Sequence, residues 1–142
     1  MSHPAQVRVM TFVPQPGTPF SERQPQTCER EYVAIALMRL LYPDMLIPAS
    51  LDVEGPAGLI ARLNAGANVI TSIIPPNAGL EGVARTKDIE DGGRTLSQLM
   101  PLISEAGLEL ASQQDYRSFI AHAQEQARTF AHTAHARQEK AG

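Results

Sequence analysis

The sequence of 142 residues contains a single cysteine, Cys28. One cysteine excludes an internal disulfide and any zinc or iron–sulfur site that needs several cysteines from this chain. No apolar run approaches the roughly 18 residues that a membrane-spanning helix requires. The first residues, Met1-Ser2-His3-Pro4, lack the basic region and apolar stretch of a secretory signal. We therefore expect a cytoplasmic protein in a reducing compartment, with no membrane partner.

Strong charge of either sign is also missing. The chain has 12 basic and 15 acidic residues, a formal net charge of −3. This balance does not favour a nucleic acid or an anionic membrane as a partner. Apolar residues make up 43% of the sequence and charged residues 19%, which is typical of a globular protein with a hydrophobic core.

Three short segments rich in apolar and β-branched residues predict buried strands at 7–13, 46–51 and 69–74. Four helices are predicted between and after them. The first is capped by Thr27 and ends before Pro43, the second runs from Pro56 to Gly66, and the third begins with a capping box of Thr95 and Gln98. The third helix ends at Gly107, and Pro101 inside it is expected to bend or shorten it.

The last helix is predicted to begin at Ser112, with Asp115 in its first turn, and to become frayed and polar after Ala134. Its apolar positions follow helical spacing: Tyr116, Phe119, Ile120, Ala123, Ala127, Phe130 and Ala134. We divide the chain into residues 1–111, part of an α/β domain, and residues 112–142, the C-terminal helix and polar tail.

Strands that alternate with helices are normally parallel and joined by right-handed crossovers. Three parallel strands form a poor independent sheet, because parallel sheets are normally covered on both faces. The pattern therefore indicates an α/β fold whose remaining strands come from elsewhere.

Alternation along the predicted strands places three polar residues on inner faces. Arg8 lies opposite the β-branched side of the first strand, and Ser50 and Asp52 lie opposite the apolar side of the second. Ser50 and Asp52 also stand at the C-terminal end of their strand, where barrel enzymes carry their chemistry. A guanidinium, a hydroxyl and a carboxylate match the polarity of an amino acid. The alternative is a buried Arg8–Asp52 ion pair with a structural role only.

The histidines and the cysteine are candidates for a metal site and a reactive thiol, but a structural role is favoured for each. The residues His122, His132 and His135 do not have the spacing of a metal site with an acidic third ligand, so we expect a solvated helix face and no metal. Cys28 stands near a helix start, which can lower a thiol pKa. Since neither histidine nor a second cysteine stands near it in sequence, a structural thiol is favoured.

Several stretches resemble the methylornithine synthase family of radical-SAM enzymes. They are Val7 to Pro19, the run Leu46-Ile-Pro-Ala-Ser50-Leu-Asp52-Val-Glu-Gly55, the segment Arg62 to Pro76, and the shorter matches 80–84 and 111–113. The likeness covers roughly residues 6–120, and the Ile-Pro-Ala-Ser-Leu-Asp string is its most specific part.

The resemblance implies the last three strand–helix units of a (βα)₈ TIM-type barrel plus C-terminal helices. It also implies an isomerase that converts L-lysine to 3-methylornithine, the first step towards pyrrolysine, with S-adenosylmethionine and a [4Fe–4S] cluster. In such enzymes an arginine, a serine and an aspartate hold the amino acid, and they match Arg8, Ser50 and Asp52. The family's three-cysteine motif and first five strands are absent from this sequence, so we expect the chain to be inactive without an N-terminal half. The alternative is a non-catalytic amino-acid-binding module or a helical interaction module.

Overall fold

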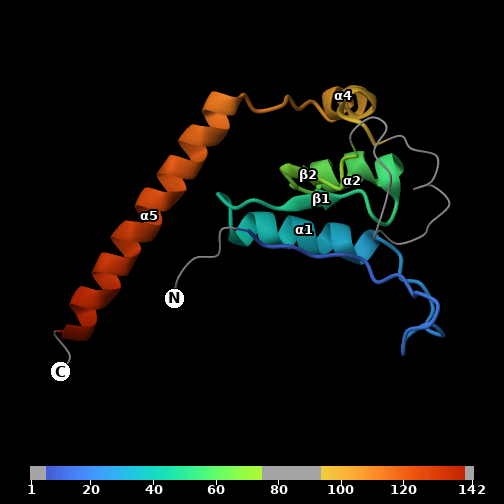
Figure 1. Cartoon of the computed structure of the whole chain (residues 1–142), viewed down its shortest axis with the longest axis horizontal. Coiled ribbons are helices and arrows are strands. Elements are labelled where there is room, and N and C mark those ends of the chain that lie inside the picture. The colour runs from blue at the N-terminus through green and yellow to red at the C-terminus, as the bar shows by residue number, and fades with distance from the viewer. Residues whose placement is uncertain (1–5, 75–93, 140–142) are drawn as a thin grey trace. The chain divides into compact units, whose positions relative to one another are not determined.

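The computed structural model describes residues 6–74 and 94–139, with side chains described as far as Thr129. Residues 6–108 form one compact unit, and the chain from Glu109 onward belongs to another. Figure 1 shows the elements of the chain. They are α1 (Glu29–Leu41), β1 (Pro48–Ser50), the 3₁₀ turn η1 (Gly55–Gly58), α2 (Leu59–Asn64), β2 (Val69–Thr71), α4 (Leu96–Glu105) and α5 (Gln113–Glu139).

The first unit is a small α/β fold around two parallel strands. In β1 and β2, Pro48 pairs with Val69 and Ser50 pairs with Thr71. Both strands are shorter than the predicted segments 46–51 and 69–74. Ser72 ends β2, because its φ of +67° takes the backbone out of the extended region.

The predicted strand at 7–13 is wrong as a strand: its one ladder pairing is an isolated parallel bridge between Gln6 and Leu46. The Val7 N–H donates to the Leu46 carbonyl over 3.2 Å. In a parallel ladder, the next bond from the neighbouring strand would come from the backbone N–H of residue 48. That residue is proline, which has no N–H, so the ladder stops after one rung.

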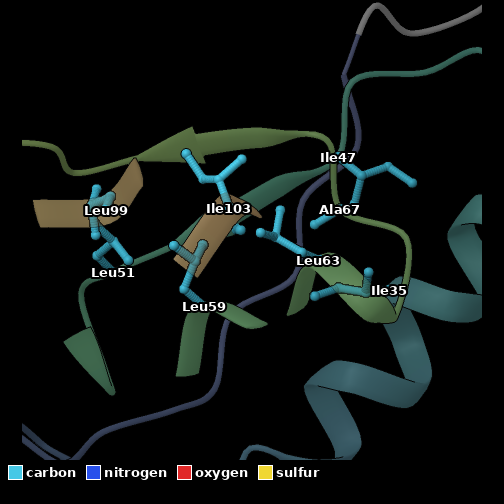
Figure 2. Close-up of a cluster of buried hydrophobic side chains, with 9 residues drawn as sticks. Ile35, Ile47, Leu51, Leu59, Leu63, Ala67, Leu99 and Ile103 are labelled. Carbon is cyan, nitrogen blue, oxygen red and sulfur yellow. The ribbon is translucent and has the colours of Figure 1, made fainter. Parts of the chain in front are cut away.

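The apolar core nevertheless follows the predicted alternation. Ile47, Ala49 and Leu51 of the β1 region are fully buried. Figure 2 shows apolar side chains from several elements converging on one cluster. Its members are Ile35, Ile47, Ala49, Leu51, Leu59, Leu63, Ala67, Leu99 and Ile103, and Val7 and Val9 pack against it from the first segment.

Several helix ends differ from the predicted signals. The helix predicted from Pro56 to Gly66 is the 3₁₀ turn η1 followed by the short helix α2, and α1 begins one residue later than its predicted cap implies. Its N-cap is Cys28 and not Thr27, because the Thr27 hydroxyl donates to the Glu29 carboxylate instead of accepting from a backbone N–H. The capping box of α4 is confirmed, and this helix runs through Pro101 without being cut short. A left-handed Gly107, with φ of +71°, follows its end as expected.

Helix α5 also begins as predicted. The Ser112 hydroxyl accepts from the Asp115 N–H over 3.1 Å, and Asp115 accepts in return from the Ser112 N–H over 3.2 Å. The helix does not end near Ala134 but continues to Glu139, which corrects the expected fraying. Alanine, arginine, glutamine and glutamate in this stretch have high helix propensities, which explains the extension. Within the described part of the chain, no helix is long and apolar enough to cross a membrane.

Candidate functional site

The structure brings the three predicted inner-face residues into contact. The Nη2 atom of Arg8 donates to the Ser50 hydroxyl over 3.2 Å. That hydroxyl donates to the Oδ2 atom of Asp52 over 2.9 Å. Arg8 Nη2 also lies 3.6 Å from the same carboxylate oxygen. Arg8, Ser50 and Asp52 therefore form one connected cluster, which we call the clamp.

The backbone explains how the clamp assembles. Ser50 is the last residue of β1, and Asp52 lies in the turn that follows the strand. The Asp52 N–H donates to the Ser50 hydroxyl over 3.4 Å, which closes a local turn. Arg8 arrives from the segment that the Gln6–Leu46 bridge holds beside β1.

Burial within the clamp is graded. Ser50 is buried, whereas the side chains of Asp52 and Arg8 are 21% and 39% exposed. A guanidinium and a carboxylate that both reach solvent can exchange a mutual contact for contacts with a zwitterionic ligand.

A second arginine, Arg94, also contacts the clamp, and the sequence reasoning did not identify it. Its Nη1 atom lies 3.6 Å from Oδ1 of Asp52, and its side chain is 1% exposed. Its carbonyl accepts from the Ile74 N–H over 3.0 Å. Arg94 directly precedes the Thr95 capping box, but no local pattern links it to Asp52, 42 residues earlier. Among the described residues, Asp52 therefore lies beside two guanidinium groups, those of Arg8 and Arg94.

A separate buried ion cluster lies on the helix side of the fold, centred on Arg62. This side chain is fully buried. It donates to both carboxylate oxygens of Glu31, over 2.7 and 3.2 Å, and to Glu54 over 3.0 Å. It also donates to the Gly58 carbonyl over 3.1 Å. A Cβ at position 58 would collide with Nη1 of Arg62, so glycine is required for this approach.

The Arg62 cluster shifts the titration of its members. Burial alone would raise the pKa of Glu31, but hydrogen bonds from Arg62 and Thr11 outweigh it, and the pKa lies below its usual range. Burial and the hydrogen bond to Glu54 raise the pKa of the Tyr32 hydroxyl. These groups therefore keep fixed charges near neutral pH, as expected of a structural cluster.

Cys28 lies at the edge of the Arg62 cluster, 3.6 Å from an Arg62 nitrogen. Burial raises its pKa despite the neighbouring guanidinium. The lowered pKa that a helix start can produce is therefore wrong for this residue, and the structure agrees with an unreactive, structural thiol.

Whether the chain could hold an iron–sulfur cluster depends on which of its side chains could bind iron. A [4Fe–4S] cluster is held by cysteine thiolates, and this sequence has one, which is buried against Arg62. In residues 6–74 and 94–139 there is no group of three histidine, cysteine, aspartate or glutamate side chains placed to hold a metal ion. The described residues do not fit such a cluster, and we derive no chemistry through it from this chain.

Comparison with known proteins identifies two relatives that are similar to most of this chain. No protein-family model matches the chain. It is 43% identical over 118 residues to the 3-methylornithine synthases of Methanosarcina barkeri and Methanosarcina acetivorans. The match covers 82% of this chain but 34% of each relative, so the chain spans about a third of their length.

A solved structure of methylornithine synthase matches the fold with a TM-score of 0.73, at 43% identity. The match covers 82% of this chain and 35% of that one. Sequence and backbone therefore agree on the same relationship and on its limited extent. The chain is a partial homologue of 3-methylornithine synthase.

Proposed function

We propose that this chain supplies the amino-acid-binding part of a radical-SAM 3-methylornithine synthase and does not catalyse the reaction alone. The complete enzyme would isomerise L-lysine to 3-methylornithine in pyrrolysine biosynthesis. The observation that carries the proposal is the connected Arg8–Ser50–Asp52 clamp, in a chain 43% identical to that enzyme. The ligand is lysine or methylornithine, bound at a partly solvent-exposed site.

The clamp has the chemistry to bind both the carboxylate and an ammonium group of an amino acid. Arg8 would take the ligand carboxylate, because a guanidinium presents paired N–H donors in carboxylate geometry. Asp52 would take an ammonium group, and the Ser50 hydroxyl would orient one of the two charged groups. Such a ligand would replace the 3.6 Å contact between Arg8 and Asp52 with two shorter ion pairs. One would join Arg8 to the ligand carboxylate, and the other would join Asp52 to a ligand ammonium group.

The proposal places this chain as the last three strand–helix units of a (βα)₈ barrel. The other strands and the three cluster-binding cysteines would then come from further polypeptide. S-adenosylmethionine bound to a [4Fe–4S] cluster would supply the adenosyl radical in that complete, cytoplasmic enzyme. The single cysteine of this chain supports the division between recognition here and radical formation elsewhere.

Calorimetric titration of the full chain with L-lysine and with 3-methylornithine tests the clamp. We expect binding by the original chain and clearly weaker binding, still measurable at higher ligand concentration, in Arg8→Gln and Asp52→Asn. Arg23→Gln is a matched control, since Arg23 lies over Phe20 and not in the clamp. A folded chain that takes up neither ligand would refute a preformed clamp.

Activity needs a separate assay. The chain alone, reconstituted with iron, sulfide, S-adenosylmethionine, lysine and a low-potential reductant such as dithionite, should form no methylornithine. Co-expression with a polypeptide that carries the remaining barrel and the cysteines should restore product, and the Asp52→Asn variant should abolish it. Product formation by the chain alone would contradict the proposed division.

The second candidate function is a helical interaction module. It is favoured by α5, a 27-residue helix that belongs to its own compact unit and exposes Tyr116 by 52%. Sedimentation of the full chain and of an Ile120→Lys variant tests it. Association of the original chain that the variant lacks would support this function, and monomers in both samples would exclude self-association through α5.

A further inference from the structure

We infer that Arg94 is a positioning residue for the proposed clamp, which holds Asp52 by the carboxylate oxygen that Ser50 and Arg8 do not use. The inference rests on the proposed function, because it assigns Arg94 a role in binding the amino acid. Its geometric basis is that Arg94 approaches Oδ1 of Asp52, whereas Ser50 and Arg8 both approach Oδ2.

Two anchored oxygens fix the plane of a carboxylate. The terminal torsion of an aspartate is broad and permits rotation when one oxygen alone is held. The Ser50 hydroxyl donates to Oδ2 over 2.9 Å, and Nη1 of Arg94 lies 3.6 Å from Oδ1. A hydrogen bond on Oδ2 and the positive charge of Arg94 beside Oδ1, at ion-pair distance, together favour one orientation of the Asp52 carboxylate.

The two arginines differ in their freedom to move. The Arg8 side chain is 39% exposed, and the Arg94 side chain is 1% exposed. Arg8 can turn toward a ligand carboxylate at little cost in packing, and Asp52 then loses one of its two cationic neighbours. Arg94 is buried and permanently charged, so it stays beside Asp52 while Arg8 is engaged.

The side chain of Arg94 is separable from its backbone role. The hydrogen bond that ties this part of the chain to Ile74 uses the Arg94 carbonyl, a backbone group that every substitution at position 94 retains. A change confined to the side chain therefore tests the contact with Asp52 without removing the backbone connection.

Ligand selectivity separates a positioning role from a merely structural one. In calorimetric titrations of the full chain, we expect Arg94→Gln to weaken lysine binding about tenfold, a coupling typical of neighbouring charged residues. Hexanoate, which has no ammonium for Asp52, should bind the variant and the original chain equally. Arg94→Lys keeps the charge and should recover part of the lysine affinity.

The Asp52→Asn background completes the binding test. There, Arg94→Gln should change lysine affinity no further, because the carboxylate through which Arg94 acts is gone. Equal losses for lysine and hexanoate, or equal losses in both backgrounds, would overturn the inference.

A ligand-free measurement keeps the inference testable if no amino acid binds and the proposed function fails. In ¹⁵N-labelled full chain, Asp52→Asn should move the Nε–H resonance of Arg94. The Nε–H of Arg62, which donates to Glu31, is the internal control and should stay in place. If the Arg94 resonance stays, or if both resonances move together, the specific contact is refuted independently of ligand binding.

Discussion

Replacing Glu31 with glutamine should destabilise the first compact unit far more than an equivalent change at the surface. Glu31 is 3% exposed and accepts hydrogen bonds from two Arg62 nitrogens and from the backbone and hydroxyl of Thr11. Four donors therefore converge on one carboxylate. Glutamine offers one acceptor oxygen and turns an NH₂ group toward the remaining donors.

The magnitude follows from the charge that is left behind. Removing one partner of a buried ion pair costs about 3–5 kcal/mol, because the other charge stays buried without compensation. Glu54 still contacts Arg62 over 3.0 Å and is 37% exposed at its side chain. This partial compensation places the expected cost of Glu31→Gln near the lower end, about 3 kcal/mol in free energy of unfolding.

Urea-induced unfolding measured by tyrosine fluorescence provides the assay, since Tyr32 lies over the Arg62 guanidinium with its ring centre 5.4 Å away. The control is Glu22→Gln, an exposed carboxylate of the same unit beside Ser21, which should cost at most about 0.5 kcal/mol. The Glu31→Met/Arg62→Met double variant should recover most of the loss, because apolar side chains leave no buried charge. A Glu31→Gln cost no larger than that of the control would refute the reasoning.

Three further outcomes are expected. The stabilisation that the Glu31 carboxylate provides should be complete above its ordinary pKa of 4.5 and should be lost as the pH falls through its lower folded-state pKa. The free energy of unfolding, measured over an acid pH series, should show this loss. The Glu31→Gln variant should lack this pH dependence. Pro48→Ala should supply the missing ladder donor, so the amide of residue 48 should be protected from hydrogen exchange; rapid exchange there would contradict the explanation of the short ladder. Leu37→Ser/Leu40→Ser should leave the unfolding midpoint unchanged, because these side chains are 54% and 80% exposed, and should lower concentration-dependent association in light scattering; unchanged association would exclude this face of α1 as its source.

Local alternation was enough to predict much of the core and the face on which Ser50 lies. In an extended chain, residues two apart share a face, so Ile47, Ala49 and Leu51 had to lie together and Ser50 opposite them. Asp52 lies beyond the strand, and its contact with Ser50 comes from a local turn. The alternation holds at positions that form no ladder: Arg8 reaches Ser50 although its segment makes a single bridge. The backbone can be extended and alternate without being paired.

Interactions between distant segments were not predictable from the sequence. Arg94 and Asp52 are 42 residues apart, and Arg62 and Glu31 are 31 apart. Arg62 lies on a short helix whose sequence is apolar apart from Arg62 and Asn64, and an arginine in such a helix is normally solvated. Its burial follows from tertiary packing that brings two glutamates into contact with it. No periodic pattern in the sequence predicts that contact.

The two ion clusters of the first unit differ in a way that separates stability from recognition. Arg62 lies between Glu31 and Glu54, has no exposed surface, and uses its guanidinium nitrogens on partners within the fold. A ligand could bind to Arg62 only if several of its hydrogen bonds within the fold broke at once. In the clamp, by contrast, Asp52 and Arg8 are partly exposed, with 21% and 39% of their side chains open to solvent. Under the proposed function, an amino-acid carboxylate would approach Arg8 without dismantling the core. Variants of Arg8 and Asp52 should therefore report on binding, whereas variants of Arg62 report on folding.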